Sequence, residues 1–176
     1  MKKNKCYVLI FIVIIVVSVI GIIIIMNNNK KPIISEFFCG RYGKKYIYSY
    51  ELDIYSDGNC KVVVQSRQSK NKKIKFKIDE SEIDKLKEKI EQSGIRDIQN
   101  TIKVNSEMQS SYIHLNYGDK GFFGIAKDGY ESNKNDYEKE DLKNYDETFK
   151  IISNVIPSEK KYELECFIKA NCNREL

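Results

Sequence analysis

The sequence has one histidine, no Cys-x-x-Cys spacing and little net charge, and each scarcity argues against a class of function. A Ser-His-Asp arrangement would have to use His114, and no serine lies within a Gly-x-Ser-x-Gly motif. Without a Cys-x-x-Cys pair, a zinc site among the cysteines is disfavoured. We therefore predict no catalytic residue, no metal site and no cofactor, and we expect His114 on the polar face of a strand.

Other ligand-binding patterns are missing as well. Gly40 and Gly43 do not have the spacing of a phosphate-binding loop. If Asp53 opened a calcium-binding loop, Tyr55 and Val64 would occupy positions that require oxygen ligands. The long polar stretch from 128 to 142 predicts a loop, and the carboxylates between 138 and 147 are interleaved with lysines, as on a solvated surface.

The charge of the chain gives no sign of a nucleic-acid partner. The chain has 30 basic and 25 acidic residues, for a formal net charge of +5. Three of the basic residues (Lys2, Lys3 and Lys5) precede a hydrophobic run, so the remainder carries 27 basic and 25 acidic residues. A nucleic-acid-binding domain normally has a larger and clustered basic excess. We predict no nucleic-acid partner.

The run from Tyr7 to Met26 contains twenty residues and no charged side chain. Twenty helical residues are about 30 Å long, which matches the hydrocarbon core of a bilayer. A single span must be helical, because lipid offers no partner for unpaired backbone groups. We predict a transmembrane signal anchor at 7–26, preceded by a short basic cytoplasmic tail at 1–6, so that the lipid bilayer is one partner of the protein.

Three alternatives to an anchor are less consistent with the sequence. A cleaved signal peptide normally has a shorter apolar region and a small-residue cleavage site, whereas this run leads into 27–32, which reads NNNKKP. A lipoprotein needs a cysteine directly after the apolar run, but Cys6 precedes the run and Cys39 lies well beyond it. A buried soluble helix would rarely contain so long an uninterrupted apolar stretch.

Flanking lysines do not decide the orientation of the anchor, because Lys30 and Lys31 balance those at the N-terminus. Long domains translocate largely regardless of charge, and a first helix usually acts as a signal anchor. We therefore expect a single-pass protein of the cell membrane, with its N-terminus in the cytoplasm. A linker at 27–43 and an extracytoplasmic domain at 44–172 would follow.

Within that domain, alternating residues predict strands at 46–55, 60–65, 73–78, 111–117 and 121–125. Asp57-Gly58 indicates a tight turn between the first two. Asp79 and Glu82 resemble a capping box before a helix that Gly94 ends. Apolar spacing predicts further helices at 145–156 and from Ser158 to about Ala170. The fold class predicted is α+β, an antiparallel sheet with two to three helices packed on one face.

Several short motifs resemble small membrane-anchored or lipoprotein ectodomains of low-GC Gram-positive bacteria. They are Gly40-x-x-Gly43 before a tyrosine-rich strand, Asp57-Gly58, Phe76-x-Ile78-Asp79 leading into Glu82-Ile83-x-x-Leu86, Ser111-x-Ile113-x-Leu115-x-Tyr117-Gly118, and Phe149-x-x-Ile152. The resemblance covers roughly 38–156 and implies the fold and a surface location, with no catalytic residue. The group would have Gly-Gly-Tyr after the second hairpin, where this chain has Phe123-Gly124-Ile125.

Four cysteines follow the predicted anchor, and the sequence leaves their pairing open. Cys39 and Cys60 are expected at opposite ends of a hairpin, too far apart for a disulfide. Cys166 and Cys172 would be roughly 9 Å apart along a continuous helix, so they could pair only if the helix ended between them.

Two groups of surface residues are candidates for binding. Lysines at 70–77 could face anionic lipid or wall polymer, or could protect an edge strand from unwanted pairing. The candidate anionic-surface patch consists of Lys72, Lys73, Lys75 and Lys77. Tyrosines 46, 48 and 50 (Tyr46, Tyr48, Tyr50) could form a binding face or pack in the core.

The leading hypothesis is a non-enzymatic binding or interaction domain that is tethered to the membrane, with another envelope protein or an anionic wall polymer as its partner. One alternative is a cell-envelope enzyme with an unrecognised site. The other is an inhibitor or immunity-type protein, which rests on fold analogy alone.

Overall fold

A computed structural model describes residues 31–42, 46–66, 70–98, 102–104, 110–118, 121–129 and 139–172. The chain divides into two compact units, Met1–Lys31 and Pro32–Leu176. Everything described below belongs to the second unit. The predicted anchor at 7–26 lies outside the described residues, and none of the helices within them is long and apolar enough to cross a bilayer.

The second unit contains strands, a short 3-10 helix (η1) and three α-helices. In chain order they are β1 (Ile34–Tyr42), β2 (Tyr46–Ile54), β3 (Asn59–Ser66), β4 (Asn71–Lys77), α2 (Glu80–Gln92), η1 (Ile95–Asp97), β5 (Ile102–Val104), β6 (Ser110–Asn116), β7 (Phe122–Gly129), α3 (Lys139–Ser153) and α4 (Ser158–Asn171).

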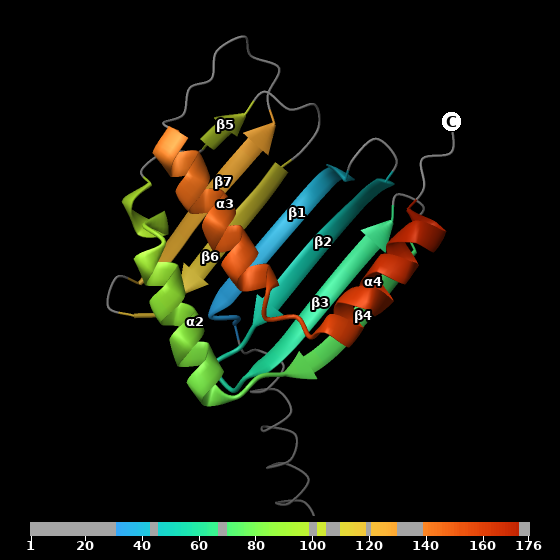
Figure 1. The fold of residues 1–176 in the computed structure, drawn as a ribbon, viewed down its shortest axis with the longest axis horizontal. Helices are drawn as coiled ribbons and strands as arrows, with labels where there is room; N and C mark the ends of the chain where they lie inside the picture. Colours follow the sequence, from blue (N-terminus) through green and yellow to red (C-terminus); the bar gives the residue numbers. More distant parts are fainter. Residues whose placement is uncertain are drawn as a thin grey trace, which may run out of the picture. The chain divides into compact units, whose positions relative to one another are not determined.

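The strands form one sheet in the order β4-β3-β2-β1-β6-β7-β5 (Figure 1). The neighbours from β4 to β7 are antiparallel, while β5 pairs in parallel with β7 at the sheet edge. β1 lies in the middle of this order and joins the meander β2-β3-β4 to the hairpin β6-β7. The prediction of a linker at 27–43 is therefore wrong for Ile34–Tyr42, which forms this central strand.

The strand register divides the sheet into two faces. Ile34 of β1 lies beside Ile54 and Leu115, and all three side chains are fully buried. Two residues further along β1, Glu36 lies between Leu52 and Ile113 on the same face. We call this the inner face of the sheet, and the face that carries the alternate residues the outer face.

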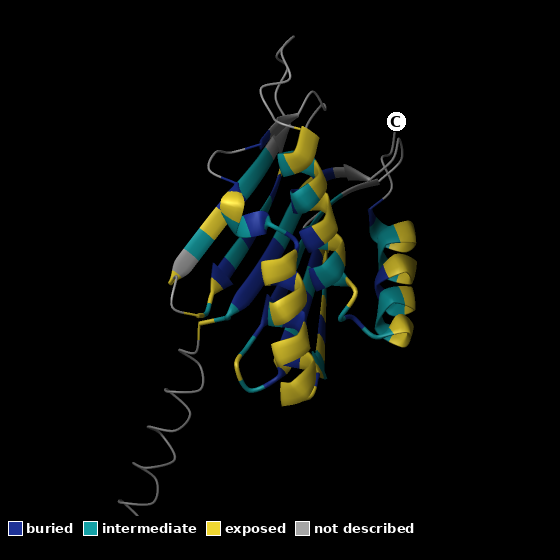
Figure 2. Ribbon diagram, turned by 60° about the vertical axis from the view of Figure 1, so that its left-hand side comes forward, coloured by how far each residue is buried: buried dark blue, intermediate teal, exposed yellow. Residues whose placement is uncertain are grey.

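The helices cover the inner face (Figures 1 and 2). α3 contacts β1 and packs beside α2, whereas α4 contacts β2, β3 and β4. α2 begins as predicted: its capping box is present, and the Asp79 backbone N–H donates to Glu82 Oε2 over 3.1 Å. α2 and α3 each place an apolar stripe toward the sheet, with Ile90 and Ile152 fully buried.

The predicted α+β class is confirmed, as is the tight turn at Gly58, whose φ of +80° favours glycine. Several local predictions need correction. The polar stretch predicted as a loop contains the start of α3, at Lys139–Leu142, and the rest of the predicted loop beyond Gly129 lies outside the described residues. α4 begins at Ser158, as predicted, with Pro157 at its N-cap. The strand β5 and its parallel pairing were not predicted.

Candidate functional site

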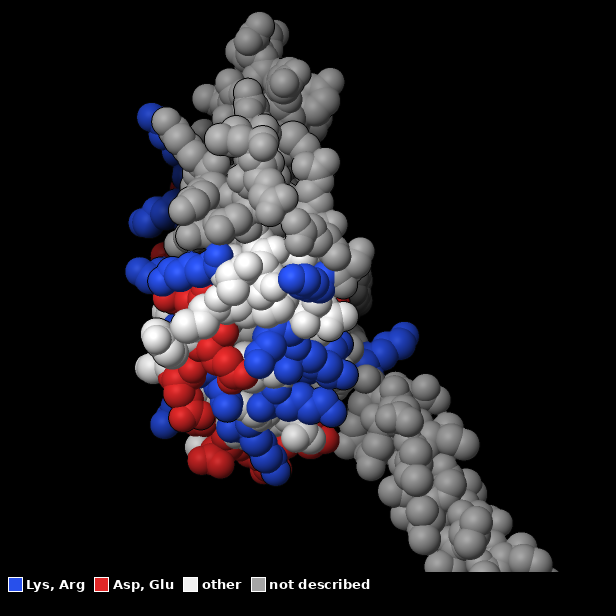
Figure 3. All heavy atoms as spheres, turned by 90° about the vertical axis from the view of Figure 1, so that its right-hand side faces the viewer, with Lys and Arg blue, Asp and Glu red and all other residues white. Residues whose placement is uncertain are grey.

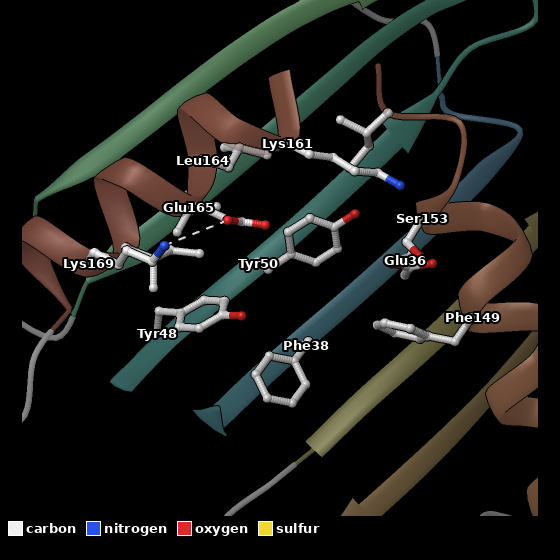
Figure 4. A pocket seen from close by; sticks show the side chains of 13 residues that line it. Glu36, Phe38, Tyr48, Tyr50, Phe149, Ser153, Lys161, Leu164, Glu165 and Lys169 are labelled. Atoms are coloured by element: carbon white, nitrogen blue, oxygen red, sulfur yellow. Dashed lines mark ion pairs between the residues drawn. The ribbon is translucent and has the colours of Figure 1, made fainter. Parts of the chain in front are cut away.

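A cavity of about 590 Å³ lies between the inner face of the sheet and the helices α3 and α4 (Figure 4). β1, β2 and β3 form its floor, and Phe149 and Ser153 of α3 form one side. Residues of α4 from Lys161 to Lys169 form the other side. Its volume is in the range of pockets that bind small organic molecules.

The cavity exists because α3 and α4 separate above the sheet. α3 ends at Ser153 and α4 begins at Ser158, so a short connection carries the chain from β1 to the β2–β4 half of the sheet. Leu164 is the buried side chain of α4, and most of the helix is half-buried or exposed. The inner face below the gap is therefore only partly filled by side chains.

Glu36 is the most unusual residue of the cavity. Its side chain occupies an inward position of the central strand and is 0% exposed. Both carboxylate oxygens, Oε1 and Oε2, have no hydrogen-bond partner among the described residues, and neither does the buried Tyr50 hydroxyl. Buried carboxylates are normally paired or hydrogen-bonded, because desolvation of an ion costs several kcal/mol.

Burial has a direct electrostatic effect on this carboxyl. Desolvation raises the pKa of Glu36 well above 4.5. The Tyr50 hydroxyl, which faces the carboxylate without the geometry of a hydrogen bond, and the Lys161 ammonium only partly oppose that shift. Burial and the negative charge of Glu36 also raise the pKa of Tyr50. A proton on Glu36 is therefore held more tightly in the folded chain than in the unfolded one.

Lys161 approaches the polar end of the cavity from α4 (Figure 4). Its Nζ donates a hydrogen bond to Asn154 Oδ1 over 3.1 Å. Among the described residues it forms no ion pair with Glu36, so the carboxylate is influenced by the lysine charge without being neutralised by it.

The remaining wall is mainly aromatic and aliphatic. Phe38 and Tyr48 lie together with ring centroids 5.7 Å apart, and Phe149 projects from α3 on the side of Glu36. At the rim, Lys169 Nζ lies 3.8 Å from Glu165 Oε2, and both side chains are exposed. The cavity thus has a buried polar end, apolar walls and a charged rim at the surface.

The structure brings two of the three candidate tyrosines into this site. Tyr48 and Tyr50 lie on the inner face and line the cavity, Tyr50 with its hydroxyl directed toward Glu36 and Lys161 (Figure 4). Tyr46 is part of β2, but its side chain is not among those that the structure describes. The sequence left open whether these tyrosines pack in the core or form a binding face. In the structure, Tyr48 and Tyr50 line the cavity.

The candidate lysine patch is divided between two faces of the sheet. Lys73, Lys75 and Lys77 are exposed on the outer face of β4, where basic side chains gather beside acidic ones (Figure 3). Lys72 points to the other face and pairs with Glu163 of α4, with Nζ and Oε1 2.6 Å apart. This ion pair lowers the pKa of Glu163 and links the edge strand to the helix.

The outer face carries His114, as predicted. Its ring stacks on Tyr112 with centroids 4.4 Å apart, and burial lowers its pKa. Ser35 lies beside His114 in the strand register, but the Ser35 hydroxyl donates to Asp53 Oδ1 over 2.9 Å. Asp53 also accepts from Lys61 Nζ over 2.9 Å. This network links neighbouring strands of the sheet, and it directs the Ser35 hydroxyl to a carboxylate, whereas a hydrolase triad directs the serine hydroxyl to the imidazole.

All four cysteines of the domain are free. α4 continues through Cys166 to Asn171, and the backbone N–H of its C-cap, Cys172, still donates to Ile168 O over 2.9 Å. The helix therefore ends only at the second cysteine, and the two thiols stay unpaired. No group of three or more potential metal-ligating side chains gathers within the part of the chain that the structure describes.

Sequence reasoning missed Glu36, the residue on which the site depends. Its segment was assigned to a linker, so the carboxylate was never placed on an apolar face. The available signal was the alternation of Ile34, Glu36 and Phe38, in which one charged residue replaces an apolar one. Comparison with known proteins gives no match to a family model and none to a curated protein.

The raised pKa of Glu36 predicts a pH-dependent effect of Glu36→Gln on stability. Below about pH 4.5 the carboxyl is protonated in both states. As the pH rises further, the unfolded chain loses this proton while the folded chain retains it. The free energy of unfolding of the wild type should then fall relative to the variant by up to about 1.4 kcal/mol per pH unit, until the folded pKa is passed.

Urea unfolding of the wild type and of Glu36→Gln between pH 4 and pH 8 measures this difference. The titration of all other residues affects both proteins equally and cancels when the two free energies of unfolding are subtracted. A difference that stayed constant over the whole range would show that Glu36 does not hold its proton more tightly in the folded state.

Proposed function

We propose that the protein is a non-enzymatic binding protein, tethered to the membrane by residues 7–26, whose extracytoplasmic domain holds a small organic molecule in the cavity between the sheet and α4. The observation that carries this proposal is the buried Glu36 carboxylate, which lines a cavity of about 590 Å³ without a hydrogen-bond partner among the described residues.

The cavity has the features that recur in small-molecule sites. Such sites are concave and mostly apolar, with a few polar groups that fix the orientation of the ligand. Here the apolar side chains include Phe38, Tyr48 and Leu164, while Glu36 and the Tyr50 hydroxyl supply unsatisfied polar atoms. These atoms are closed off from water, so a ligand would reach them by displacing a side chain of the cavity wall. Its hydrogen bonds to them would then offset part of their desolvation cost.

Binding without chemistry is favoured because, among the residues that the structure describes, the polar end of the cavity has no nucleophile hydrogen-bonded to a base. The hydroxyl of Ser153 donates to Lys150 O over 3.2 Å, which is a bond within its own helix. Strongly perturbed pKa values are common at functional sites. The raised pKa of Glu36 is as consistent with a role in binding as with a role in catalysis.

Filling the cavity should abolish binding of a neutral aromatic probe, for which we choose indole. The full chain in lipid nanodiscs should bind indole with a dissociation constant on the order of 1 mM, or about 0.5 kcal/mol per non-hydrogen atom. In Val64→Phe the larger ring enters the cavity from β3, and binding should weaken at least about tenfold. Equilibrium dialysis measures the bound fraction.

Val63→Phe is the matched control, because Val63 neighbours Val64 in β3 but lies on the outer face. It should retain wild-type binding above the lipid background. If Val64→Phe failed to fold, Ile168→Trp would fill the same space from α4. Absence of saturable binding to the wild type, or equal binding by the cavity-filling variant, would refute the proposed function.

The proposed topology makes a separate prediction. Protease added to intact cells should degrade the domain that follows the anchor, because long C-terminal domains translocate even when flanking charges are balanced. Immunoblotting with an antibody against 139–172 follows the loss, and lysed cells show that the domain can be cleaved. Full protection in intact cells with cleavage after lysis would place the domain in the cytoplasm.

A further inference from the structure

At the buried end of the cavity, the Glu36 carboxylate has hydrogen-bond acceptor sites that no described donor fills. Glu36 Oε1 and Oε2 have no donor among the described residues, and the carboxylate is completely removed from solvent. The Tyr50 hydroxyl can offer one hydrogen at most. When ionised, a carboxylate can accept more hydrogen bonds than this end of the cavity supplies.

Aromatic rings occupy the same space. Phe38, Tyr48, Tyr50 and Phe149 all line the cavity that Glu36 enters (Figure 4). Aromatic faces carry partial negative charge, so they attract a cation, and the attraction strengthens when water is excluded. A carboxylate together with aromatic rings favours a positively charged group over a neutral or negative one.

Lys161 of α4 lies near this end of the cavity in Figure 4, and one of its three N–H donors bonds to Asn154 Oδ1. Lys161 forms no ion pair with Glu36, so the carboxylate can still accept a charge-assisted hydrogen bond from a ligand. Such bonds are roughly twice as strong as neutral ones.

We propose that the ligand of this cavity is an organic ammonium compound, with its charged nitrogen at Glu36 and its apolar body among the aromatic side chains. This inference rests on the proposed function and specifies the chemical class of the ligand. The ammonium donates to the Glu36 carboxylate, and the apolar body lies against Phe38, Tyr48 and Leu164. A ligand with an anionic head would instead use Lys161.

Three compounds with one phenyl ring and different head groups test this assignment. They are phenethylamine, phenethyl alcohol and hydrocinnamate, which present an ammonium, a hydroxyl and a carboxylate. The full chain is placed in nanodiscs of neutral phosphatidylcholine, so that lipid charge does not attract the amine. Phenethylamine should bind about tenfold or more tightly than phenethyl alcohol, and hydrocinnamate should bind weakest.

Two variants assign each head group to its partner. Glu36→Gln should weaken phenethylamine about tenfold and change phenethyl alcohol by less than about twofold, since only the charged bond is lost. Lys161→Met should leave phenethylamine binding unchanged or stronger, because a neighbouring positive charge is removed. The head-group ranking in the wild type tests the inference even if a variant does not fold.

The outcomes separate this inference from the proposed function. If indole binds but phenethylamine is no tighter than phenethyl alcohol, or hydrocinnamate is tightest and Lys161→Met weakens it, the ammonium assignment is wrong and the binding cavity remains. If neither indole nor any of the three compounds binds, both proposals fail.

Discussion

The structure of the domain is organised around one buried carboxylate on the central strand of its sheet. β1 pairs with β2 on one side and β6 on the other, so its inward residues lie in the middle of the sheet. Ile34 fills such a position with a fully buried apolar side chain, as the packing requires. At the next inward position the chain has Glu36, and the helices above it separate.

This arrangement has a cost that a leucine at the same position would avoid. A buried carboxylate without partners is destabilised as an ion by several kcal/mol, so the folded chain favours its protonated form. A functional use explains why such a residue lies in the core, since perturbed titratable groups cluster at functional sites. That function is ligand binding in the cavity beside Glu36, because a ligand there can supply the missing hydrogen bonds.

Much of the fold follows from short-range patterns in the sequence. The alternation of 46–54, the Asp57-Gly58 turn and the capping box at Asp79 each depend on neighbouring residues, and the structure contains all three. The outward lysines of β4 were predicted in the same way, since Lys73, Lys75 and Lys77 alternate with inward residues. These features could be predicted because local geometry decides them.

The features that were missed depend on contacts between distant residues. β1 is a strand because β2 and β6 flank it, and its own pattern is interrupted by Glu36. β5 is only three residues long and is defined by its pairing with β7. The partner of Lys72 is Glu163, on a helix about ninety positions away in the sequence, so no local pattern could separate Lys72 from the other lysines. The cavity likewise results from how α3 and α4 diverge.

The protonation state of Glu36 is the central claim, and it can be measured directly by NMR. The chemical shift of the Glu36 side-chain carboxyl carbon, followed against pH in the full chain, gives the pKa of this residue. The account predicts a midpoint well above 4.5 in the empty cavity and a fall when phenethylamine is added. A midpoint near 4.5 without any ligand would contradict it.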